Sequence, residues 1–186
     1  MYSMSLRQRT QILYTPDISL ILGRLGLKPG FKVVESGTGT GSLSVSIIKS
    51  VLPSGHLFTF EFNEKRQLSA KQDFENIGLS EYVTSTHRDV LSNGFLLDDK
   101  VKEDSIDAAF LDLPNPEKAV PHAFAVLKTK GKLCNFSPCI EQVQKVSLAM
   151  AEQGFYDIRT FECLSKEMQS SNFTYDSIYK DMNDVQ

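Results

Sequence analysis

The sequence lacks the features of several large classes of protein. It has only three cysteines, an odd number, in a chain of 186 residues that is 41% hydrophobic and long enough to bury its own core. We therefore expect no disulfide framework, and we expect the chain to reside in a reducing, intracellular compartment. No stretch approaches the roughly 20 apolar residues of a membrane span. Residues 1–10 carry Arg7 and Arg9 without the apolar run of a secretory signal.

The chain also lacks an excess of positive charge. Its formal net charge is -3, so the domain as a whole is not a basic nucleic-acid binder. A nucleic-acid substrate would need a local basic patch or a basic partner. Lys128, Lys130 and Lys132 form a basic edge. We favour a solvated loop there, and a contact with phosphate is the alternative.

Several catalytic signatures are missing as well. There is no Gly-x-Ser-x-Gly elbow, which argues against a serine hydrolase. The three histidines and the three cysteines show no paired metal-ligand spacing, so we predict no metal site.

Short apolar runs alternate with helix-like segments along most of the chain. The expected strands are 31–35, 56–62, 82–88, 106–113, 132–137 and 155–164. The expected helices are 17–25, 42–52, 64–77, 117–127 and 140–153, with a polar loop over 91–104. This order predicts an α/β fold with a Rossmann-like, doubly wound and mostly parallel sheet. Residues from 165 onward are polar, with a further edge strand conceivable over 173–179.

Four acids lie at or near the ends of the expected strands: Glu35, Glu61, Asp89 and Asp112. Ligands of such sheets bind beyond the carboxyl ends of the strands, near the switch point. An acid that ends the second strand is placed to accept hydrogen bonds from ribose hydroxyls. Asp89, which ends the third strand, is a candidate partner for an adenine amino group.

A glycine turn follows the first strand. Glycines stand at 37, 39 and 41, and position 42, where a dinucleotide fingerprint requires a third spaced glycine, is Ser42. No Gly-Lys-Ser/Thr follows, so the turn is not a P-loop. The pattern Glu-x-Gly-x-Gly-x-Gly is typical of S-adenosylmethionine-dependent methyltransferases, and a dehydrogenase is a distant alternative.

The chain resembles a family: the catalytic subunits of the tRNA (adenine-N1)-methyltransferase that modifies the T-loop adenosine at tRNA position 58. The resemblance runs from about Arg9 to Leu164. The segments that carry it are 9–14 with 17–18, 35–42, 55–57 with 61–62, 89–90, 110–114 and 136–143. The last of these, Phe-Ser-Pro-Cys-Ile-Glu-Gln-Val, is characteristic of the eukaryotic members.

The resemblance implies a role for each matching position. Glu61 would hold the cofactor ribose with Arg66 beside it, Asp89 and Val90 would frame the adenine, and Asp112 would lie where methyl donor and target base meet. Asp112 is therefore the predicted catalytic residue. The predicted residues for binding S-adenosylmethionine are Leu13, Glu35, Gly37, Gly39, Thr40, Gly41, Ser42, Leu43, Glu61, Arg66, Asp89, Val90 and Asp112.

The resemblance also implies a tRNA substrate, a related non-catalytic tRNA-binding subunit in a heterotetramer, and a nuclear location. Glu117 stands where family members usually carry an aromatic residue. The family's β-rich domain is missing before Arg9, so we expect residues 1–186 to form a single catalytic domain. Two alternatives stay open: a non-catalytic tRNA-binding or scaffold paralogue, and a methyltransferase for another RNA or a small molecule.

Overall fold

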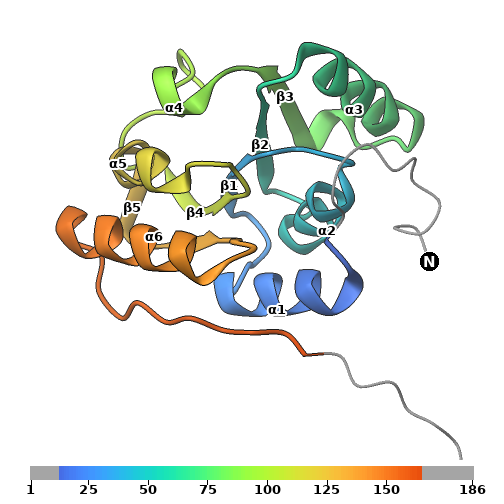
Figure 1. Cartoon of the computed structure of the whole chain (residues 1–186). Helices are drawn as coiled ribbons and strands as arrows, with labels where there is room; N and C mark the ends of the chain where they lie inside the picture. The colour runs from blue at the N-terminus through green and yellow to red at the C-terminus, as the bar shows by residue number, and fades with distance from the viewer. Residues whose placement is uncertain (1–12, 165–186) are drawn as a thin grey trace, which may run out of the picture.

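The computed structural model describes residues 13–164 and shows five parallel strands in one sheet (Figure 1). The strands are β1 (Lys32–Ser36), β2 (His56–Glu61), β3 (Val83–His87), β4 (Ile106–Leu111) and β5 (Leu127–Asn135). Their order across the sheet is β3-β2-β1-β4-β5, and all four pairings are parallel. The predicted doubly wound α/β fold is confirmed.

Helices cover both faces of this sheet. They are α1 (Thr15–Leu25), α2 (Ser42–Val51), α3 (Glu64–Asn76), α4 (Val90–Asn93), α5 (Pro116–Val126) and α6 (Ile140–Gln153), with a 3-10 turn at Ser80–Tyr82. The apolar sides of α1, α2 and α3 share one core cluster with alternate residues of the strands. On the opposite face α4 and α5 pack on the remaining strand residues, and α6 packs against α5 (Figure 1).

The switch point of the sheet lies at β1. This strand pairs with β2 on one side and β4 on the other, so Ser36 is in register with both Phe60 and Leu111. The chain leaves β1 toward one face and β4 toward the other, and a crevice opens between their carboxyl ends.

The expected loop over 91–104 is partly helical. Asp89 caps α4, and the segment beyond it is anchored by Phe95 and Val101, which are both buried in the core. Burial of Phe95 and Val101 therefore fixes the position of this segment, although its polar composition predicts a loop.

The fifth strand starts earlier than expected, and it is interrupted. Leu127 pairs with Ile106, but the next pair joins Lys132 to Ala108. One residue of β4, Asp107, thus stands opposite four residues of β5, which leave the ladder as a short excursion. Lys130 within it has a positive φ of 68°.

The expected last strand over 155–164 is wrong. After α6 ends at Gly154 the chain follows no strand, and its residues are almost all exposed. Asp157 has a φ of 57°, which breaks an extended run. The segment runs below the sheet toward α1 (Figure 1), where the guanidinium of Arg24 lies 3.8 Å from the ring centre of Phe161. The edge strand considered over 173–179 lies outside the described residues.

Candidate active site

The glycine turn connects β1 to α2 at the switch point. Gly37, Gly39 and Gly41 all have positive φ, at 91°, 54° and 76°. A Cβ on Gly37 would collide with the backbone carbonyl oxygen of Asp112. The turn is therefore wound in a way that only glycine permits without strain, and it lies directly against the end of β4.

The turn also leaves the start of α2 open. Gly41 is the N-cap residue, and no side chain caps the first amides of the helix. Unsatisfied N–H groups at a helix N-terminus, together with the helix dipole, favour a negatively charged or polar ligand group. The ten-residue α2 thus presents donors at the position where the resemblance places the cofactor.

Glu61 connects the turn to α3. Its Oε2 accepts a hydrogen bond from the backbone N of Gly39 at 3.2 Å. Its Oε1 accepts from the backbone N of Asn63 at 3.0 Å and from Arg66, whose Nη2 lies 2.8 Å away. The carboxylate is only 3% exposed. The structure therefore brings Glu61 and Arg66 together beside the turn, and their contacts with the cofactor remain predictions.

Glu35 lies beneath the turn rather than on its surface. It is 1% exposed, and its Oε2 accepts a 2.6 Å hydrogen bond from the hydroxyl of Ser44 on α2. Burial raises the pKa of Glu35 to about 7, against the opposing effect of the Ser44 and Thr59 hydroxyls. The carboxyl supports the turn and titrates near neutral pH.

Asp112 follows β4 and is joined to the end of β1, since its backbone N donates to the carbonyl of Ser36 at 2.9 Å. Burial raises the pKa of its carboxyl, and the negative charge of Glu61 raises it further. A positive charge that develops next to Asp112 would oppose this effect and favour the ionised form.

A narrow cleft lies beside the glycine turn, Glu35 and Asp112. Its lining residues are Leu13, Glu35, Gly37, Thr38, Gly39, Thr40, Ser42, Leu43, Phe110 and Asp112. The cleft holds about 30 Å³, roughly the share of one water molecule in the liquid.

Five predicted binding residues do not line this cleft: Gly41, Glu61, Arg66, Asp89 and Val90. Glu61 still bonds the glycine turn through Gly39, whereas Asp89 and Val90 make other contacts. The carboxylate of Asp89 caps α4, with Oδ1 accepting from Leu91 N at 3.0 Å and Oδ2 from Ser92 Oγ at 2.7 Å. Val90 is 2% exposed and belongs to the core on the α4 and α5 side. Their expected contacts with adenine remain predictions.

Sequence reasoning missed the residue that holds the turn after Asp112. The side-chain amide nitrogen of Gln142, on α6, donates to the carbonyl oxygens of Leu113 at 3.2 Å and Pro114 at 2.8 Å. These carbonyls follow the end of β4 directly. Gln142 stands in the segment that carries the resemblance, but the helix pattern indicates only core packing there.

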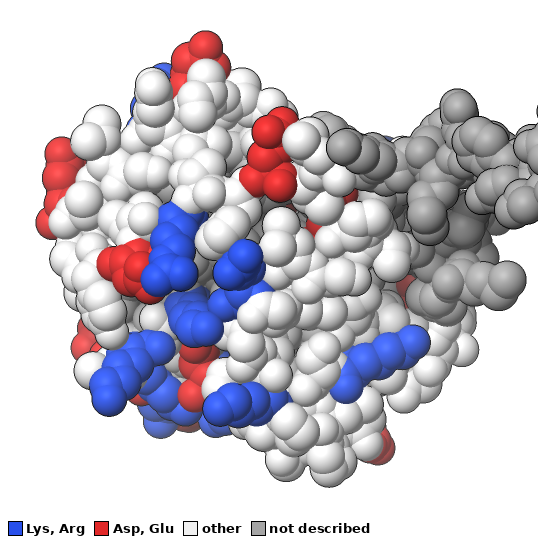
Figure 2. All heavy atoms as spheres, turned by 90° about the horizontal axis from the view of Figure 1, so that it is seen from below, with Lys and Arg blue, Asp and Glu red and all other residues white. Residues whose placement is uncertain are grey.

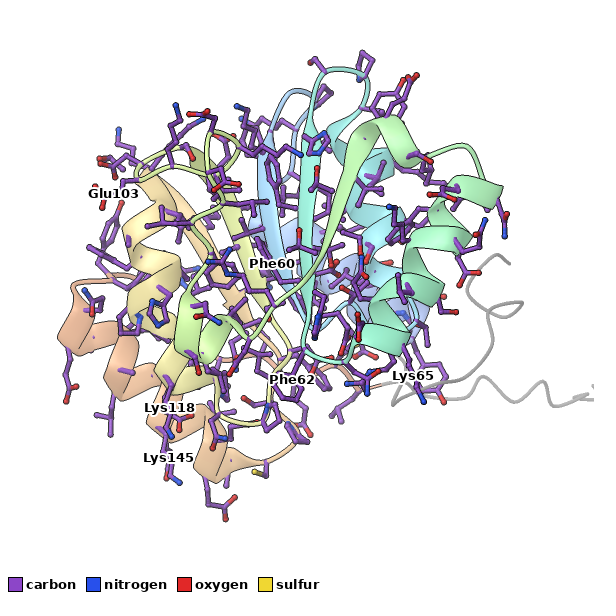
Figure 3. All side chains as sticks on the ribbon, turned by 90° about the horizontal axis from the view of Figure 1, so that it is seen from above. Phe60, Phe62, Lys65, Glu103, Lys118 and Lys145 are labelled. Atoms are coloured by element: carbon purple, nitrogen blue, oxygen red, sulfur yellow. The ribbon has the colours of Figure 1, made fainter. Side chains whose placement is uncertain are left out.

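The carboxyl edge of the sheet also carries an exposed aromatic residue. Phe62, directly after Glu61, is 69% exposed. Figure 3 shows Phe62, Lys65, Lys118 and Lys145 at this end of the strands and Glu103 at the other. These aromatic and basic side chains therefore lie at the same end of the sheet as the candidate site.

The described residues show no other candidate centre of catalysis. Between residues 13 and 164, no group of three His, Cys, Asp or Glu side chains is arranged to hold a metal ion. Within the same range, no helix has the length and apolarity needed to cross a membrane. All three cysteines are free thiols, and burial raises the pKa of Cys134 to about 11.

Comparison with known families gives one match over nearly the whole chain. The profile of the family described as the GCD14 subunit of the tRNA methyltransferase complex matches residues 1–185. The catalytic subunit of tRNA (adenine(58)-N(1))-methyltransferase from Dictyostelium discoideum is 48% identical over 96% of this chain and 57% of its own length. The corresponding subunit from Candida albicans is 44% identical over 89% of this chain and 49% of its own length. The chain thus spans about half the length of these relatives.

Solved structures agree with the fold. A SAM-dependent O-methyltransferase from Thermotoga maritima superposes with a TM-score of 0.79 at 31% identity, covering 88% of this chain and 59% of that one. The tRNA (m1A58) methyltransferase TrmI from Aquifex aeolicus superposes with a TM-score of 0.69 at 25% identity, covering 80% of this chain and 56% of that one.

Proposed function

The chain belongs to the family of GCD14 subunits of the tRNA methyltransferase complex, and on that premise we propose that it is a catalytic subunit that methylates N1 of the T-loop adenosine at tRNA position 58. S-adenosylmethionine is the proposed methyl donor. One observation carries the proposal: the glycine turn, Glu61 and Asp112 meet at the switch point, with Gly37 packed directly on Asp112.

The residues present fit the cofactor. The first amides of α2 lack side-chain caps and suit a carboxylate. Glu61 is a buried acceptor beside the turn, which suits ribose hydroxyls. When bound, S-adenosylmethionine supplies a methyl group activated by a positively charged sulfur. Glu61 and Asp112 place two carboxyl groups beside the turn, and negative potential there suits that charge.

The chain's own contribution to the reaction is mainly placement. N1 of adenine has a free lone pair, so no strong base is needed to create the nucleophile. Alignment of N1 with the methyl group of the donor then accounts for most of the rate acceleration. Methylation leaves a positive charge on the base. Asp112 is positioned to accept a hydrogen bond from the exocyclic amine and to stabilise that charge. Gln142 holds the turn that follows Asp112.

Methylation of transcribed tRNA by the 186-residue chain, with and without its partner subunit, tests the proposal. The modified base is mapped by primer extension, because methyl at N1 blocks base pairing. We expect modification of the T-loop adenosine in the presence of the partner. Modification of a different base would refute the specific site while leaving methyl transfer in place.

Calorimetric titration with S-adenosylmethionine separates an enzyme from a scaffold. We expect saturable binding to the wild-type chain and none to a Gly37→Val variant, since a Cβ at that position collides with the end of β4. A wild-type chain without saturable binding would favour a non-catalytic, tRNA-binding paralogue.

We further propose that the chain works with a related non-catalytic subunit in a heterotetramer, and in the nucleus. The family description names a complex, and the relatives are named catalytic subunits, which supports a partner. The net charge of -3 supports it too, because a partner would add to the limited positive surface that this chain offers to tRNA. Light scattering of the co-expressed subunits tests the stoichiometry, and imaging of a tagged chain tests the location.

A further inference from the structure

A basic pocket lies at the opposite end of the sheet from the candidate active site. It has a volume of about 290 Å³ and lies between the end of α1, the start of β1 and the excursion of β5. Its lining residues are Leu25, Gly26, Lys28, Phe31, Asp107, Lys128, Thr129, Lys130, Gly131 and Lys132. We call it the lysine groove. Figure 2 shows lysines and arginines gathered on the underside of the molecule, with few acids between them.

The excursion of β5 builds one wall of the groove. Four residues of β5 stand opposite Asp107, which brings Lys128 and Lys130 out of the ladder toward solvent. The bend depends on the left-handed backbone of Lys130 and on Gly131, where a Cβ would lie 2.8 Å from the carbonyl oxygen of Lys128. In a regular strand Lys128, Lys130 and Lys132, which are two residues apart, would all point to one face of the sheet. The excursion instead takes Lys128 and Lys130 out of the ladder, while Lys132 stays paired with Ala108.

The single acid of the groove is already neutralised. Asp107 Oδ1 lies 2.6 Å from Lys128 Nζ, and its Oδ2 accepts from the backbone N of Lys32 at 2.8 Å. Lys132 Nζ donates to the carbonyl of Arg24 at 3.0 Å. Lys28 and Lys130 form no ion pair within the described part of the chain, so their charges face the groove uncompensated.

The groove combines these charges with two apolar side chains. Leu25 is buried and Phe31 is half-buried. Ammonium groups bind phosphate as point charges, and aromatic surface suits a base or a sugar. The volume lies near the lower limit for small-ligand sites, which suits one nucleotide unit rather than a duplex.

We propose that the lysine groove is a second RNA contact, which binds the backbone of the tRNA at a distance from the methylated base. The proposal rests on the proposed function for the identity of the RNA. The five residues of β1 separate the groove from the carboxyl edge by about 17 Å at the usual rise per strand residue. A few nucleotides of RNA cover that distance, so one molecule can reach both ends of the sheet.

Charge reversal of the two free lysines tests the groove. The variant K28E/K130E is compared with K71E/K102E, which reverses two lysines outside the groove and has the same net charge. Binding of a labelled T-arm RNA to the full chain is followed by fluorescence anisotropy over a salt series, without cofactor. Loss of two phosphate contacts should weaken binding at least tenfold and reduce the salt slope by about 1.5. The control should stay within twofold of wild type, and melting curves check that both variants are folded.

Three results would overturn the groove: no RNA binding by the wild-type chain, equal binding by K28E/K130E and wild type, or tighter binding of poly-glutamate than of RNA. The last would assign the groove to an acidic protein segment. The results distinguish this proposal from the proposed function. If K28E/K130E binds RNA tenfold more weakly but the wild type does not methylate tRNA, the groove is supported and the proposed function is refuted. If the wild type methylates tRNA but K28E/K130E binds RNA as the wild type does, only the groove is refuted.

Discussion

Glu35 should make the stability of the cofactor-free chain fall as the pH rises through the weakly acidic range. Its pKa is about 7 in the folded protein, against 4.5 for an unperturbed glutamate, because the carboxyl is buried. The folded state therefore binds more protons than the unfolded state between these values. Under proton linkage, the free energy of unfolding decreases with pH across that window and levels off above it.

The size of the effect follows from the same two values. A difference of roughly 2.5 pKa units corresponds to about 3 kcal/mol when fully expressed. For a domain of this size, 1 kcal/mol shifts the melting temperature by about 2–4 °C, so the full effect is on the order of 6–12 °C. Glu35→Gln removes the titration while keeping the shape and an oxygen that accepts from Ser44.

The assay is the melting temperature of both chains by circular dichroism between pH 5 and pH 8. We expect the melting temperature of the wild type to fall relative to that of Glu35→Gln as the pH rises. The full difference of about 6–12 °C should be present by about pH 8. Ser44→Ala provides a second variant: it removes a hydrogen bond that lowers the pKa of Glu35 in the folded protein, so the decline should begin at the same pH but continue to a higher pH. Parallel curves for wild type and Glu35→Gln would refute the assignment of a neutral, buried carboxyl.

Three further predictions concern the turn and its neighbours. Asp112→Ala should abolish methyl transfer in the complex with the partner while weakening cofactor binding less; wild-type turnover on tRNA would show that the assignment is wrong. Gly37→Ala should remove calorimetric binding of S-adenosylmethionine and cost at least about 1 kcal/mol of stability from the left-handed backbone alone; an unchanged melting temperature would contradict it. Gln142→Ala should lower kcat with little change in the dissociation constant of S-adenosylmethionine, because it frees the turn after Asp112 but leaves the glycine turn intact. Equal losses in both quantities would indicate general destabilisation instead.

Local backbone requirements were readable from the sequence alone. Three alternating glycines after an apolar run predict a tight left-handed turn, since only glycine adopts that conformation freely, and the structure has it. The alternation of strand-like and helix-like segments likewise predicts a parallel, doubly wound sheet, because parallel neighbours require helical crossovers. The membership of the family follows from the segments that carry the resemblance.

Only the tertiary structure decided which side chains meet. Glu61 ends β2 and Asp89 lies two residues after β3, yet Asp89 uses both of its carboxylate oxygens to cap α4, while Glu61 bonds the glycine turn and Arg66. Gln142 reaches the turn after Asp112 from a helix that begins nearly 30 residues later. The segment over 155–164 has a strand-like pattern but finds no strand partner and runs toward α1 instead. Sequence patterns specify the backbone of each element, whereas the partners of a side chain depend on packing between elements that are distant in the chain.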